Sequence, residues 1–105
     1  MQSEVLKGHV DLLLLAALEE GPAHGYAIVE TVRSRSGRVF ELAEGTVYPA
    51  LYRLERRALL ESAWAEGQGA RRRRVYRLTR KGSAELARQR RGWGDYVQAM
   101  QTALA

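Results

Sequence analysis

The stretch Glu44-Gly-Thr-Val-Tyr-Pro-Ala-Leu-Tyr-Arg-Leu-Glu55 predicts the helix around which this chain is organised. Three aliphatic residues recur at helical spacing and form one apolar stripe: Val47, Leu51 and Leu54. Thr46 or Gly45 is expected to cap the start of the helix, which places Pro49 where backbone N–H groups have no intrahelical partner. The other side carries aromatic hydroxyls and guanidinium groups, on Tyr48, Tyr52, Arg53 and Arg56. A short helix with such an outer side suits a nucleic-acid groove.

The composition restricts the chain to one small domain. Its 105 residues are 46% hydrophobic, which allows a modest core that a second subunit would extend. There is no cysteine, so disulfides, thiolate catalysis and cysteine-based zinc sites are excluded. The longest apolar run, Leu12 to Leu18, is too short to cross a membrane, and the first residues lack the pattern of a secretion signal. We therefore expect a cytoplasmic protein with no membrane partner.

The charge is unevenly distributed along the chain. Residues 1–70 hold seven Lys or Arg and ten Asp or Glu, a net −3, whereas residues 71–105 hold ten and two, a net +8. Fifteen of the seventeen basic residues are Arg, whose planar guanidinium binds phosphate through a fork of donors. A basic final third predicts a docking face for a polyanion.

Periodicity and turn residues predict helices near 8–20, 24–36, 46–57 and 80–103, with strands at 39–42, 59–65 and 73–78. Gly37 is expected to take a left-handed cap after the second helix, and Thr79 to cap the last one. Three helices followed by a hairpin are the order of a winged helix-turn-helix. We therefore expect a mainly α fold with a small β-hairpin: a DNA-binding domain at 1–78 and a C-terminal dimerisation helix at 79–105.

The run Arg71, Arg72, Arg73 and Arg74 lies at the expected hairpin. Such runs are often only solvated surface, but adjacent like charges repel one another and are best tolerated where phosphates neutralise them. Contacts of this kind fix position on DNA rather than sequence, and they weaken steeply with salt.

The last helix carries a coiled-coil-like stripe interrupted by Arg90; its members are Leu86, Trp93, Val97, Met100 and Leu104. The stripe could pack within the subunit. A helix trailing so small a domain more often packs on its own copy, and a symmetric dimer is the commonest oligomer. Such a homodimer would place two recognition helices about 34 Å apart, one turn of DNA.

Other functional classes have less support. His9 and His24 have no partner at metal-ligand spacing, and Gly67-Gln-Gly69 lacks the Lys-Ser/Thr of a phosphate loop, so no catalytic residue, metal or cofactor is expected. An RNA-binding module would need an exposed sheet of stacking aromatics. A protein-interaction module that docks an acidic partner on the basic face remains the alternative to DNA binding.

Three segments resemble signatures of the PadR family of bacterial transcriptional regulators: residues 24–28 (His-Gly-Tyr-Ala-Ile), 44–55 and 73–82 (Arg-Arg-Val-Tyr-Arg-Leu-Thr-Arg-Lys-Gly). The length and single C-terminal helix match the short branch of that family. The resemblance implies a dimeric winged-helix repressor of an inverted-repeat operator in double-stranded DNA. By position, the DNA contacts would be Tyr26, Thr46, Tyr48, Pro49, Tyr52 and Arg53, with Arg71 to Arg74 in the wing.

The resemblance also implies a small aromatic or hydrophobic effector that enters at the dimer interface, where Trp93 and Tyr96 would line its pocket. One departure is visible: Ala58 stands where the family usually has Gly, just after the recognition helix. Because Ala disfavours the left-handed conformation by about 1 kcal/mol, the turn into the wing is expected to differ.

Overall fold

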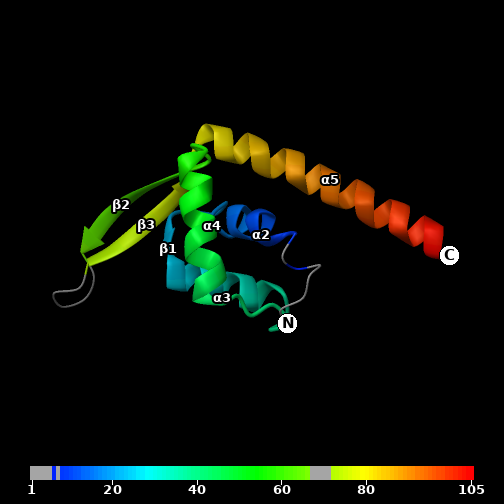
Figure 1. Cartoon of the computed structure of the whole chain (residues 1–105), viewed down its shortest axis with the longest axis horizontal. Coiled ribbons are helices and arrows are strands. Elements are labelled where there is room, and N and C mark those ends of the chain that lie inside the picture. Colours follow the sequence, from blue (N-terminus) through cyan, green and yellow to red (C-terminus); the bar gives the residue numbers. More distant parts are fainter. Residues whose placement is uncertain (1–5, 7, 67–71) are drawn as a thin grey trace.

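The computed structural model describes residue 6 and residues 8–66 and 72–105. Figure 1 shows a small helical body, a hairpin on one side, and a long helix that leaves the body on the other. The elements are α2 (Val10–Ala17), β1 (Ala23–His24), α3 (Gly25–Arg35), α4 (Glu44–Arg56), β2 (Leu60–Glu66), β3 (Arg72–Leu78) and α5 (Arg80–Leu104). This is the expected winged helix-turn-helix. The described part of the chain contains no helix able to span a membrane.

The core lies where α2, α3 and α4 meet the base of the hairpin. The apolar stripe of α4 is confirmed, because Val47, Leu51 and Leu54 are all 0% exposed. Leu14 and Leu15 of α2 are equally inaccessible. No polar or charged side chain among the described residues is buried, so burial of apolar area holds α4 in place. Because its apolar side faces the core, the opposite side of α4 faces solvent.

The start of α4 differs from the prediction. The helix begins at Glu44, and the capping position is Ala43, whose carbonyl accepts bonds from the N–H groups of Thr46 and Val47 at 2.9 and 3.0 Å. Neither Thr46 nor Gly45 caps the helix, because both lie within its first turn. Pro49 consequently falls beyond the first turn, where it leaves the carbonyl of Gly45 without an intrahelical partner.

The strand expected at 39–42 is also absent. The Ser36 hydroxyl donates to the Arg33 carbonyl at 3.1 Å and accepts from the Phe40 N–H at 2.9 Å, so local bonds hold this segment as a turn. The left-handed conformation of Gly37 is confirmed, with φ of 63°, and Arg38 follows it at 68°.

The third strand of the sheet is instead β1, two residues long, which pairs antiparallel with β3. The strand order is β1-β3-β2, and Ser62 faces Tyr76 within the hairpin. Of the connection expected at 66–70, only Glu66 is among the described residues. Residues 67–70 and Arg71 lie outside them.

The turn from α4 into the wing keeps the left-handed conformation despite the Ala at its end. Ala58 adopts φ of 61°, so the expected difference at this turn is not found. Its carbonyl accepts a 2.6 Å bond from the Thr79 hydroxyl, while the Thr79 N–H donates to the Leu59 carbonyl at 3.1 Å. Thr79 Oγ1 also accepts from the Gly82 N–H at 2.9 Å, which confirms the predicted cap.

Leu86 belongs to the interior rather than to a dimer face. It is 2% exposed and packs with the core of its own subunit, which corrects its prediction as an interface residue. The physical reason is that the first part of α5 lies against the body, and the helix projects away from it only toward its C-terminal end (Figure 1).

Candidate nucleic-acid interface

The outer side of α4 displays the two predicted tyrosines. Tyr48 is 46% exposed and Tyr52 is 61% exposed, although the opposite side of the same helix is fully buried. The Arg56 guanidinium lies 5.8 Å from the centroid of the Tyr52 ring, an arrangement typical of a cation–π contact. Large exposed aromatics beside cations suit stacking and hydrogen bonding to a nucleic acid.

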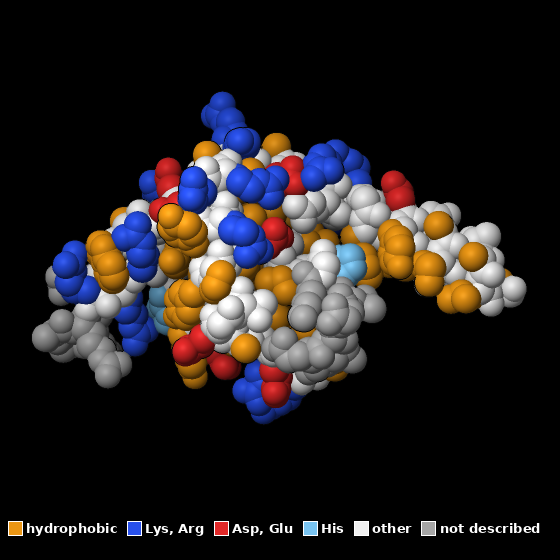
Figure 2. Space-filling view, viewed as in Figure 1, with side chains coloured by type: hydrophobic (Ala, Val, Ile, Leu, Met, Phe, Trp, Pro, Cys, Tyr) orange, Lys and Arg blue, Asp and Glu red, His pale blue; other side chains and the backbone are white. Residues whose placement is uncertain are grey.

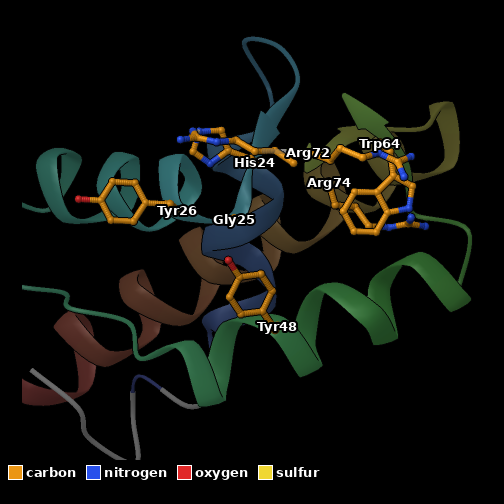
Figure 3. Close-up of a pocket in the computed structure, with 8 residues that line it drawn as sticks. His24, Gly25, Tyr26, Tyr48, Trp64, Arg72 and Arg74 are labelled. Atoms are coloured by element: carbon orange, nitrogen blue, oxygen red, sulfur yellow. The ribbon is translucent and has the colours of Figure 1, made fainter. Parts of the chain in front are cut away.

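Tyr48 packs over the first residue of α3. An added Cβ at Gly25 would lie 2.7 Å from the Tyr48 hydroxyl oxygen, so the tyrosine ring occupies the space that any other side chain would need. Figure 3 shows Tyr48 extending from α4 toward Gly25, while Tyr26 extends from α3 away from the arginines. Tyr26 is exposed, as a contact with DNA would require.

The wing adds a cluster of arginines around one aromatic ring. Trp64 on β2 faces Arg74 on β3, and the guanidinium carbons of Arg72 and Arg74 lie 5.2 and 5.3 Å from its centroid. Trp64 is nevertheless 55% exposed. Sequence reasoning missed this residue, although its alternation with Leu60 and Ser62 placed it on the side of the hairpin that carries Tyr76.

His24 joins the start of α3 to the wing. Its Nδ1 accepts a 3.3 Å bond from the Ala27 N–H and so caps the helix. Its Nε2 lies 2.7 Å from Nη1 of Arg73. Partial burial and, secondly, the charge of Arg73 lower the pKa of His24, so the ring is neutral at neutral pH.

These groups line a cleft of about 530 Å³ between α3, α4 and the wing (Figure 3). Its described lining is His24, Gly25, Tyr26, Tyr48, Trp64, Arg72, Arg73 and Arg74. A second cleft of about 630 Å³ continues along α4 past Tyr52 and Arg56. Figure 2 shows Lys and Arg side chains gathered over the hairpin and along the adjoining edge of the molecule.

The sequence model of the family described as "Transcriptional regulator PadR-like family" matches residues 14–88. The chain belongs to this PadR-like family. The family consists of transcription regulators rather than enzymes, so this protein is a DNA-binding regulator of transcription.

Solved structures agree with this assignment. A PadR family regulator from Clostridium difficile R20291 is 32% identical, with 93% of this chain and 100% of that chain covered and a TM-score of 0.80. A PadR family regulator from Eggerthella lenta DSM 2243 is 33% identical, with coverage of 96% and 86% and a TM-score of 0.82. A transcriptional regulator from Clostridium thermocellum is 29% identical, with coverage of 95% and 97% and a TM-score of 0.87.

Arg53 of the PadR-like protein lies apart from the clefts. Its Nη2 bonds to Oδ1 of Asp11 on α2 at 3.3 Å, so it points toward α2 rather than toward the wing. The side chain is still 59% exposed. Pro49 is exposed between the two sides, and Thr46 is half-buried. The predicted DNA-contacting residues of α4 therefore point in different directions, the tyrosines toward the wing and Arg53 toward α2.

The free part of α5 carries the other predicted residues of this PadR-like protein. Trp93 is 40%, Tyr96 55%, Met100 42% and Leu104 76% exposed, and Val97 between them is half-buried. The Trp93 and Tyr96 rings stack with centroids 5.9 Å apart, and Trp93 meets His9 edge-on at 4.7 Å. Arg90, which interrupts the stripe, forms two 3.1 Å bonds to the Glu19 carboxylate and lowers its pKa.

Proposed function

We propose that this protein is a dimeric repressor that binds an inverted-repeat operator through α4 and the wing. The observation that carries the proposal is the exposure of Tyr48 and Tyr52 beside a wing that carries Arg72, Arg73 and Arg74. Tyr52 and Arg53 on the outer side of α4 would contact bases, with Thr46, Tyr48 and Pro49 beside them. Tyr26 and the wing would contact phosphates.

The dimer would form through α5, with residues 1–78 as the DNA-binding domain and 79–105 as the dimerisation helix. Trp93, Met100 and Leu104 present large apolar surfaces to solvent, and a second copy of the same helix would remove them from water. In Figure 2 the projecting part of the molecule carries hydrophobic side chains along one edge. A small aromatic or hydrophobic effector would insert beside the stacked Trp93 and Tyr96, change the angle between subunits and release the DNA.

Selection of bound duplexes from a random pool tests the DNA-binding proposal. The expected product is an inverted repeat whose half-sites are about 34 Å apart, bound with a steep salt dependence. A pool without enrichment, together with salt-insensitive binding, would instead support a protein-interaction module that uses the basic face.

Sedimentation of the Trp93→Ala, Met100→Ala double variant tests the dimer. The variant is expected to sediment as a monomer at concentrations where the wild type is a dimer. Because both side chains are exposed in the subunit, its own fold should be retained. A variant that dimerises as the wild type does would contradict the proposed interface.

A further inference from the structure

Asp11 is an acidic residue of α2 that lies beside the proposed DNA-reading surface. Its Oδ1 is 3.3 Å from Nη2 of Arg53, which belongs to α4. The Asp11 side chain is 32% exposed and that of Arg53 is 59% exposed. A carboxylate in this position repels the phosphates of DNA, so its presence beside an arginine proposed to read bases calls for an explanation.

The fold holds the two partners to different degrees. Asp11 lies in the first turn of α2, where the positive end of the helix dipole stabilises a carboxylate. Its neighbours on the helix anchor it in the core, because Val10, Leu14 and Leu15 are 5%, 0% and 0% exposed. Arg53 has instead a long side chain, whose many rotamers must be restricted before it binds one base. Asp11 is therefore the fixed partner, and Arg53 is the one that it orients.

The bond to Asp11 leaves Arg53 able to contact a base at the same time. A guanidinium carries five N–H donors in one plane, and a single donor satisfies this bond. Guanine is the base that a guanidinium recognises best, through two hydrogen bonds to O6 and N7. An arginine that is held on one edge presents its remaining donors in a restricted direction.

We propose that Asp11 is a positioning residue for base recognition, which holds Arg53 in the orientation that reads a guanine and does not touch DNA itself. The inference rests on the proposed function, because it requires α4 to face DNA. The carboxylate offsets the charge of Arg53 and so weakens attraction to every phosphate. It also restricts the directions open to Arg53 and so favours one base. Asp11 thus lowers general affinity for DNA and raises specificity.

Asp11→Ala tests this combination of effects, because the loss of an ordinary DNA contact would weaken binding to every sequence. Each base pair of the selected duplex is replaced in turn, and affinities for this set and for a random duplex are measured by fluorescence anisotropy. Arg53→Ala identifies the base pair that Arg53 reads. Asp11→Ala should lose about 10-fold of discrimination at that base pair and at no other. It should bind the random duplex about 3-fold more tightly at low salt, with a salt slope steeper by about one.

Asp11→Asn separates charge from orientation. The Asn side chain keeps an oxygen that accepts from Arg53 but carries no charge. Asp11→Asn should therefore tighten binding to the random duplex as much as Asp11→Ala does, and keep part of the discrimination that Asp11→Ala loses.

Glu20→Ala is the matched control. Glu20 follows α2 and pairs with Arg35 of α3 at the same distance of 3.3 Å, so this substitution also removes one carboxylate from an exposed ion pair. Arg35 lies at the C-terminal end of α3 and is not among the described residues that line the two clefts beside α4. Glu20→Ala should leave base preference, affinity and salt slope unchanged. Because exposed ion pairs contribute little to stability, Glu20→Ala and Asp11→Ala should both melt close to the wild type.

The outcomes separate the positioning of Arg53 from DNA binding itself. If Arg53→Ala loses discrimination at one base pair and Asp11→Ala does not, the positioning role is refuted and the DNA face stands. If Asp11→Ala loses discrimination at every base pair alike, Asp11 supports the fold rather than Arg53, and the proposal is again refuted. If neither these variants nor Arg72→Ala changes binding, the proposed DNA-binding function itself is refuted.

Discussion

Gly25→Ala tests the proposed contact of Tyr48 with DNA. The new Cβ would lie 2.7 Å from Cε1 and from the hydroxyl oxygen of Tyr48, and 2.8 Å from Cζ, whereas carbon atoms in contact prefer about 3.5–4.0 Å. The tyrosine ring must therefore move by about 1 Å. Overpacking costs about 1–3 kcal/mol, and the gain of Ala over Gly in a helix offsets up to about 1 kcal/mol. Because Tyr48 is 46% exposed and can swing outward, we expect a net loss of stability of at most about 2 kcal/mol.

Gly25→Ala should weaken DNA binding by more than its effect on stability would suggest. Displacing Tyr48 removes its contact, and we expect about 10-fold weaker binding to the selected duplex, measured by fluorescence anisotropy, with urea denaturation run in parallel. Gly92→Ala is the matched control: nothing lies within 4 Å of its added Cβ, so it should add about 1 kcal/mol of stability and leave affinity unchanged. In a Tyr48→Ala background, Gly25→Ala should weaken binding no further. Equal losses in both backgrounds would refute the reasoning.

Three further predictions concern the packing at the start of α5, the recognition of DNA sequence, and the dependence of stability on pH. Gly82→Ala places a Cβ 1.9 Å from the Leu59 carbonyl oxygen, which is backbone and cannot move aside, so urea denaturation should show a loss of at least about 3 kcal/mol; a loss below 1 kcal/mol would contradict this. Arg53→Ala should weaken binding to the selected duplex by about 1–3 kcal/mol and relax base preference, whereas Arg72→Ala should weaken all sequences alike; identical, sequence-independent effects would show that the division is wrong. Because the pKa of His24 is lowered in the folded state from about 6.5, the unfolded state binds the proton more readily, and stability should fall as the pH drops below about 6.5. His24→Asn should lack this component of the decrease.

Local sequence patterns correctly predicted the helices and strands that contribute many residues to the core. The stripe of α4 and the Thr79 cap depend on neighbours three or four residues away, and both are found. The strand predicted at 39–42 is absent because hydrogen bonds of the Ser36 side chain compete with strand formation. β1 was missed because two residues are too few to show alternation, and its partner, β3, is some fifty residues away in sequence.

The candidate site was predictable only in part, because some of its contacts join residues that are far apart in sequence. Exposed tyrosines on α4 follow from the helical period, but the setting of Trp64 depends on the register of the hairpin, which brings Arg74 opposite it. The cap that His24 forms on α3 is a local contact, whereas its approach to Arg73 depends on how the sheet attaches to α3. Arg53 was predicted on the outer side of α4 with the tyrosines, and its bond to Asp11 on another helix turns it toward α2 rather than toward the wing.

Helix α2 and the turn after it connect the proposed recognition helix to the proposed dimerisation helix. Asp11 of α2 bonds to Arg53 of α4, and Glu19, just beyond α2, forms two 3.1 Å bonds to Arg90 of α5. These ion pairs are largely exposed and screened by solvent, so they orient side chains more than they join elements. The buried leucines of α2 make the stronger connection, because Leu14 and Leu15 are 0% exposed and sit in the same core as the α4 stripe and the start of α5. A close-packed core does not deform gradually. A rotation of α5 at a dimer interface would therefore carry α2 and α4 with it as one body and alter the spacing of the two recognition helices rather than the shape of either.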